Sequence, residues 1–132
     1  MEKLYYPAVF QKEITGYSVW LHDISGCISQ GETFEEAVEN ITDALGLFVE
    51  EYRSNGDKLP APTLPNEIQL EDDQFTTIIS FDWAAYQKKH NNKAVKKTLT
   101  IPSWLNTLAE EQHVNFSGVL QAALKEKLHI TE

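Results

Sequence analysis

The last third of the chain carries the pattern that most constrains its fold: a short strand followed at once by two short helices. Residues 96–101 alternate in polarity, and Pro102 ends the alternation. Apolar residues then recur at helical spacing in two segments that end near Leu128. One strand and two short helices cannot bury a hydrophobic core alone. The pattern therefore predicts a module that folds only together with a second copy.

The two faces of this strand differ in chemistry. Because side chains alternate along a strand, Leu99 and Ile101 share an apolar face. In a ribbon-helix-helix dimer, two such strands pair antiparallel, and their polar face enters the DNA major groove. We therefore predict a ribbon-helix-helix domain at residues 94–130. The predicted base-reading residues on the polar face are Lys96, Thr98 and Thr100.

The two helices supply the remaining parts of this expected domain. Pro102 suits a helix N-terminus, where its missing N–H costs nothing. Asn115 is a good N-cap for the second helix. Its first residues would present free N–H groups to a DNA phosphate, and they are Asn115, Phe116 and Ser117. The expected dimer core is apolar and consists of Leu99, Ile101, Leu105, Leu108, Val119, Leu120, Ala123 and Leu124.

Charge is divided unequally along the chain. Residues 1–92 carry 6 Lys+Arg and 16 Asp+Glu, a net −10, whereas residues 93–132 carry 5 and 4, a net +1. An acidic body suits a basic protein partner and repels a phosphate backbone. Only the tail is therefore expected to approach DNA. The alternative is that residues 96–101 form an ordinary edge strand of an upstream sheet; the polar stretch at residues 82–93 argues against it.

Residues 1–85 predict one α+β domain with the element order β-β-β-α-β. Pro7 suggests that the first strand lies at a sheet edge or that Pro7 starts it. Thr33 and Glu36 form a capping box that opens a helix ending near Gly56. Residues 86–93 are polar and are expected to be a linker, with a helical turn expected at residues 83–86. Strands are expected at residues 4–10, 17–21, 27–30 and 75–81.

The joint spacing of several turn and cap residues points to a known family. The pattern is Asp23-x-x-Gly26-Cys27-x-x-x-Gly31-x-Thr33-x-x-Glu36-Ala37, with Pro7-Ala8-Val9-Phe10 before it and Leu59-Pro60-x-Pro62 after it. Over roughly residues 3–63 this resembles the HicB antitoxins. His22 and Ser25 depart from the pattern, since the family usually has proline there. The resemblance implies a degenerate ribonuclease-H-like fold that blocks HicA, a small basic RNA-cleaving toxin, and a C-terminal domain that represses the operon.

The resulting hypothesis is a type II antitoxin that acts by binding, without catalysis, cofactor or metal. Its C-terminal dimer would bind an inverted-repeat operator, and a heterotetramer with the toxin is expected. The single Cys27 and the absence of a signal peptide or apolar span of membrane length fit a cytoplasmic protein. Acidic and aromatic residues are the candidate toxin contacts: Tyr17, Trp20, His22, Asp23, Glu35 and Glu39.

Two other classes of function stay open at this level. One is a transcription regulator whose first domain senses a small ligand in a pocket lined by Tyr5, Tyr6, Tyr17 and Trp20. The other is a residual metal-dependent nuclease. Such an enzyme needs three or four converging carboxylates. Only Asp23 and Asp82 follow strands in a way that would bring them to one sheet edge.

Overall fold

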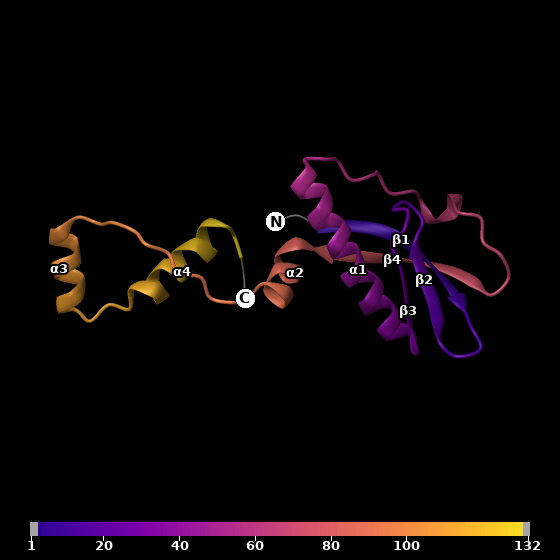
Figure 1. Ribbon diagram of the computed structural model, residues 1–132, viewed down its shortest axis with the longest axis horizontal. Coiled ribbons are helices and arrows are strands. Elements are labelled where there is room, and N and C mark those ends of the chain that lie inside the picture. The colour runs from indigo at the N-terminus through magenta and orange to yellow at the C-terminus, as the bar shows by residue number, and fades with distance from the viewer. Residues whose placement is uncertain (1–2, 131–132) are drawn as a thin grey trace. The chain divides into compact units, whose positions relative to one another are not determined.

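The structure, a computed structural model, describes residues 3–130 and divides them into two units (Figure 1). The first unit comprises residues 3–91, and the second comprises residues 92–130. The first unit is a mixed α+β fold, as the sequence predicts. Its elements are β1 (Lys3–Lys12), β2 (Tyr17–Leu21), β3 (Ile28–Gly31), α1 (Phe34–Asn55), the 3₁₀ turn η1 (Pro65–Glu67), β4 (Gln74–Asp82) and α2 (Trp83–His90).

The four strands form one antiparallel sheet in the order β3-β2-β1-β4. The β1–β2 hairpin closes at Gly16, whose φ of 77° suits glycine, and the Glu13 amide donates to the Gly16 carbonyl at 3.0 Å. Helix α1 covers one face of the sheet (Figure 1). The core lies between them and is built mainly from Tyr6, Ala8, Phe10, Val19, Leu21, Ile79 and Phe81 of the strands and Ala37, Ile41, Leu45 and Val49 of α1.

Pro7 lies inside an interior strand that begins at Lys3, so both expectations, an edge strand and a strand start, are wrong. Strand β1 pairs with β4 opposite Pro7, but its register with β2 begins only at Ala8. The Pro7 carbonyl accepts from the His22 amide at 3.4 Å, which shows that the proline nitrogen also faces the β2 side. Because β2 ends at Leu21, the position where Pro7 lacks an N–H lies just beyond the paired residues of β1 and β2. The proline therefore removes no hydrogen bond from that ladder.

The ends of α1 follow the predicted signals. The Thr33 hydroxyl accepts from the Glu36 amide at 3.1 Å, and the Glu36 carboxylate accepts from the Glu32 amide at 3.3 Å. Gly56 ends the helix with a left-handed φ of 70°. The capping box is thus confirmed, although the carboxylate reaches Glu32 and not Thr33.

Helix α2 differs from the expected linker at residues 86–93, because residues 86–90 are helical. The Asp82 carboxylate caps α2 by accepting from the Ala85 amide at 3.2 Å. Tyr86 is buried in the core of the first unit. The polar composition of this stretch gave no indication that one of its side chains is buried. The boundary between the units falls after Asn91.

The second unit contains α3 (Ser103–Glu111) and α4 (Phe116–Lys127) at the predicted places. The strand expected at residues 96–101 is absent from the described chain, whose residues 91–102 have no regular secondary structure. A strand needs a partner for its N–H and C=O groups, and the expected partner is the same strand of a second copy. Among residues 92–130, no residue is buried.

Candidate functional site

Tyr17 lies in an aromatic cluster where the β1–β2 hairpin meets the start of α1. Its ring meets Phe34 and Phe75 edge-on, with centroid distances of 6.3 and 6.0 Å. The Phe10 ring stacks on Phe75 with a centroid distance of 5.1 Å. The Lys12 ammonium lies 5.1 Å from the Tyr17 ring. Tyr17 is therefore partly buried by these rings, and the rest of its side chain is exposed at the hairpin end of the unit.

Trp20 and His22 lie elsewhere. In the ladder, Trp20 stands opposite Val9 and Ile28, so it projects from the sheet face that α1 does not cover. Trp20 is half-buried and Ile28 is exposed. His22 follows the end of β2 and is exposed. These two candidates thus do not share a surface with Tyr17.

Asp23 fastens a loop. Its carboxylate accepts from the Thr63 amide at 3.0 Å and from the Thr63 hydroxyl, which ties the β2–β3 turn to the proline-rich segment after α1. The Tyr6 hydroxyl donates to the Pro60 carbonyl three residues earlier in that segment. Burial, followed by the nearby Asp23 and Tyr52, raises the pKa of Tyr6. Asp23 therefore has a structural role that the sequence did not reveal.

Glu35 and Glu39 lie on the solvent-exposed side of α1. They continue the acidic surface that the sequence predicts for this helix. Of the six candidate toxin contacts, Tyr17 and Glu35 lie near each other, because Tyr17 contacts Phe34, the residue before Glu35, whereas Glu39 lies further along α1, near Lys89 of α2. The structure places Trp20, His22 and Asp23 apart from these three.

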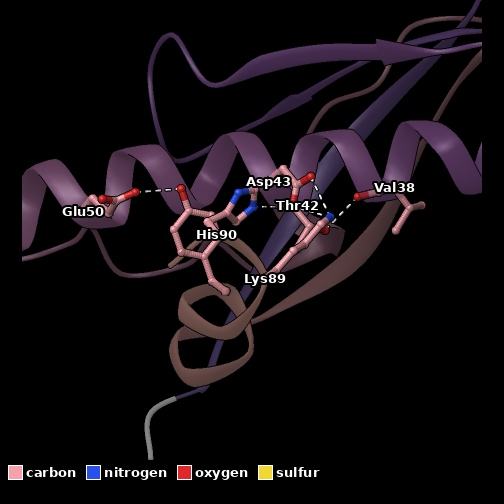
Figure 2. A network of polar contacts seen from close by, with 7 residues as sticks. Val38, Thr42, Asp43, Glu50, Lys89 and His90 are labelled. Carbon is pink, nitrogen blue, oxygen red and sulfur yellow. Dashed lines mark hydrogen bonds and ion pairs between the residues drawn. The ribbon is translucent and has the colours of Figure 1, made fainter. Parts of the chain in front are cut away.

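Two other acidic residues of α1 hold α2 in place (Figure 2). The Lys89 ammonium donates to both Asp43 carboxylate oxygens at 3.2 and 3.0 Å, and the His90 Nε2 lies 3.6 Å from Asp43. The Tyr86 hydroxyl donates to Glu50 at 2.7 Å. Burial, together with Glu50, raises the pKa of Tyr86 to about 12.

The carboxylates needed for a nuclease are already engaged. Asp23 holds Thr63, and Asp82 caps α2. Among residues 3–130, no three His, Cys, Asp or Glu side chains are grouped as a metal ion would require. Cys27 is buried, and burial raises the pKa of its thiol to about 11, so it is a core residue without thiolate character at neutral pH.

A hollow of about 470 Å³ lies at the C-terminal end of α1 and does not match the expected ligand pocket. Polar and charged side chains dominate its lining, which consists of Ser25, Phe48, Glu51, Tyr52, Asn55, Asp57 and Lys58. None of the four aromatic residues that the sequence suggested for a ligand site lines it. Its polar character is unlike the mostly apolar clefts that bind small ligands.

The predicted DNA-reading side chains Lys96, Thr98 and Thr100 are all exposed, and so is Lys97. Asn115 caps α4 as predicted, since its side chain accepts from the Gly118 amide at 3.0 Å. Phe116 and Ser117 follow it at the exposed start of α4. The start of α4 thus has the expected cap, whereas residues 96–101 form no strand.

The predicted dimer core is uncovered in the single chain. Six of its eight residues are strongly exposed: Leu99 58%, Ile101 46%, Leu105 42%, Leu108 53%, Val119 58% and Leu124 51%. Ala123 is also exposed, and Leu120 is half-buried. Apolar residues exposed in this number are typical of an interaction surface.

The fold and these surfaces define a two-unit binding protein. A family model described as a HicB-like antitoxin of bacterial toxin–antitoxin systems matches residues 5–124. The chain therefore belongs to the HicB-like antitoxin family, and an antitoxin is not an enzyme. Among the described residues, every helix is too short or too polar to span a bilayer.

Individual proteins and solved structures are also similar to this chain. A UPF0150 protein of Synechocystis sp. is 38% identical over 60 residues, which are 45% of this chain and 76% of that protein. A toxin–antitoxin complex from Streptococcus pneumoniae contains a chain with 28% identity and a TM-score of 0.61, with 96% of this chain and 99% of that chain covered. A HicA3–HicB3 complex contains a chain with a TM-score of 0.50 and 24% identity over 60% of this chain and 99% of that chain, which shows likeness of fold.

Proposed function

We propose that this antitoxin neutralises a small, basic HicA-type mRNA-cleaving toxin by covering its active site, and that it represses its own operon as a dimer. The first unit would be a degenerate ribonuclease-H-like domain that binds the toxin in the cytoplasm. The second unit would be a ribbon-helix-helix domain. Family membership and the similar toxin–antitoxin complexes support the toxin partner.

One observation carries the proposed dimer: the described part of the second unit has no buried residue of its own. Burying a large aliphatic side chain contributes about 1.5–3 kcal/mol, so this unit lacks the main source of stability. In the proposed dimer, residues 96–101 of two copies pair antiparallel, and Leu99 and Ile101 pack on the helices below. The strand that is absent from the single chain would then form.

The reading face of this ribbon supports the proposed DNA contact. Lys96, Thr98 and Thr100 would enter the major groove, where lysine donates to guanine and threonine contacts thymine or bonds a base edge. The amides at the start of α4 would bind phosphate on either side. The near-neutral charge of residues 93–132 contrasts with the net −10 of residues 1–92 and suits this assignment.

For the toxin, we propose that the contact centres on the exposed first turns of α1, which carry Glu35 and Glu39, and extends to Tyr17, whose ring contacts Phe34 at the start of that helix. Exposed carboxylates there would face basic side chains of the toxin, and the aromatic ring would supply apolar area. Two first units on one dimeric repressor give a heterotetramer with two toxins. Toxin abundance would then influence operator occupancy.

Substitutions in the reading strand test this division of labour. Lys96→Ala or Thr98→Ala should each weaken operator binding by about 1–3 kcal/mol, measured by gel shift at fixed salt. Neutralisation of the toxin encoded by the neighbouring reading frame should stay intact, because the changed residues lie in the other unit. Thr107→Ala, on the helix that follows the strand, is the control. Loss of both functions from a folded variant would refute the proposal.

A further inference from the structure

One side of α1 is acidic along most of the helix. At 3.6 residues per turn, four of its carboxylates lie within about 80° of one another around the helix axis. This acidic stripe consists of Glu35, Glu39, Asp43 and Glu50. Glu35 and Glu39 are exposed, whereas Asp43 and Glu50 are half-buried and contact α2. The acidic stripe therefore has an open first half, where the toxin contact is proposed, and a second half that α2 covers.

The last turn of α2, which lies on the covered half, is basic. It contains Lys88, Lys89 and His90, although residues 1–92 have only 6 Lys+Arg in all. The Lys89 ammonium donates to both carboxylate oxygens of Asp43, and His90 Nε2 lies 3.6 Å from the same carboxylate (Figure 2). The hydrogen bond to Asp43, and then the charges of Asp43 and Glu39, raise the pKa of Lys89. The chain thus places a cation of its own where the two halves of the acidic stripe meet.

The ion pair of Lys89 and Asp43 can break without loss of the whole helix α2. The two side chains are 52% and 37% exposed, and ion pairs as exposed as this contribute little to stability. Other contacts hold the rest of α2, because Asp82 caps its start and the buried Tyr86 donates to Glu50. A competing cation can therefore release the last turn while Tyr86 stays in the core.

We infer that the last turn of α2 is an internal competitor of the toxin: a basic side chain of the toxin displaces Lys89 from Asp43, and the toxin contact then extends along the whole acidic stripe. This inference rests on the proposed function, because it concerns how the toxin reaches α1. A lone cation gains nothing by replacing Lys89. A partner already bound at Glu35 and Glu39 presents its next basic side chain at a high effective concentration, so the competitor favours a partner with several spaced cations.

Displacement of Lys89 also changes the connection between the two units. The last turn of α2 leads directly into residues 91–102, which have no regular secondary structure. Three residues that leave a helix for an extended chain gain about 5 Å of reach. Toxin capture would therefore lengthen the connection to the DNA-reading unit.

Removal of the competing cation tests the inference in the full chain. Lys89→Gln should bind a catalytically inactive form of the toxin from the neighbouring reading frame about two- to fivefold more tightly in isothermal titration calorimetry, as expected for loss of an exposed ion pair. Lys93→Gln is the matched control, because it removes the same charge from an exposed position outside the first unit. The difference between the two variants measures the competition. Equal affinities, or weaker binding by Lys89→Gln, would overturn the inference.

The Asp43→Asn background shows whether the competition occurs at this carboxylate. There, Lys89→Gln should give no greater gain in toxin affinity than Lys93→Gln, because the ion pair is already broken. A gain that persists in this background contradicts displacement of Lys89 from Asp43.

Amide hydrogen exchange follows the turn itself. The Asn91 amide donates to the Gln87 carbonyl at 2.7 Å and closes the last turn of α2. Saturating toxin should speed exchange of the amides of residues 89–91 by about tenfold or more, while the amides of β1 stay protected. Slower or unchanged exchange at residues 89–91 would mean that the turn stays in place, and the inference fails. A native chain that binds no toxin refutes the proposed function together with this inference, whereas toxin binding without an effect of Lys89 refutes the inference alone.

Discussion

At the scale of single residues, Asp23 shows how a plausible contact residue can have an internal role. Removing its carboxylate leaves the amide and hydroxyl of Thr63 without their acceptor. Hydrogen bonds to charged groups contribute about 1.5–3 kcal/mol, and partial exposure places this pair near the lower end. Asp23→Ala should therefore lower the free energy of unfolding in urea by about 1.5 kcal/mol. The exposed Asp72→Ala should change it little, and equal effects would contradict the loop-fastening role.

Tyr86 predicts a dependence of stability on pH. The pKa in the folded chain is about 12, above the usual value of 10.0. The unfolded chain therefore ionises first as pH rises, and the stabilising contribution, complete below pH 10, is lost between about pH 10 and pH 12. From pH 9.5 to 11, the stability advantage of the native chain over Tyr86→Phe should shrink by about 1 kcal/mol. A difference that stays constant in urea titrations at both pH values would rule out this linkage.

At the scale of elements, α1 and α2 are joined by close packing around Gly46. A Cβ added at this glycine would lie 2.0 Å from a ring carbon of Tyr86. Gly46→Ala should therefore destabilise the first unit by about 1–3 kcal/mol, although alanine favours helices. Leu47→Ala, at the next and exposed position, is the control for thermal melting. In a Tyr86→Ala background the cost of Gly46→Ala should largely disappear, and an unchanged cost would exclude ring contact as its cause.

The same elements show why parts of the fold were predictable. The β1–β2 hairpin, the caps of α1 and the start of α4 depend on local signals such as Gly16, Thr33 and Asn115. The continuation of α2 beyond its expected first turn was missed because its buried side chain, Tyr86, is set by tertiary packing within a polar sequence. The central place of β1 was missed because strand order does not follow from Pro7 alone. The strand predicted at residues 96–101 is absent from the described chain, and in the proposed dimer it would depend on a second copy, which no single sequence window contains.

The candidate surfaces show the same contrast between features that local sequence patterns predict and features that depend on the folded structure. Exposure of the predicted DNA-reading and dimer residues follows from the alternation and helical spacing in the tail. Which side chains from different elements lie on one surface does not follow from such local patterns. Tyr17 and Trp20 are three residues apart on one strand, yet the pleat places them on opposite faces of the sheet. Sequence patterns therefore suggest residue types for a toxin contact but do not show which of these residues share a surface.

At the scale of the whole molecule, charge is separated between an acidic first unit and a nearly neutral tail. If the toxin is basic, its association should be steered by this charge, and its rate should fall as salt screens the acidic surface. Raising sodium chloride from roughly 50 to 500 mM should slow toxin association by about tenfold or more, with a smaller change in dissociation.

Charge reversal then separates the two acidic surfaces of the first unit. Glu35→Lys with Glu39→Lys changes the exposed face of α1, and Glu71→Lys with Asp72→Lys makes the same change in net charge on the loop before β4. Both double variants lose the same long-range attraction. Only the α1 variant should also dissociate faster from the toxin, because it alone would place like charges within the contact. Stopped-flow association and surface-plasmon-resonance dissociation rates distinguish these effects. Faster dissociation of the loop variant alone would move the toxin contact from α1 to the acidic loop.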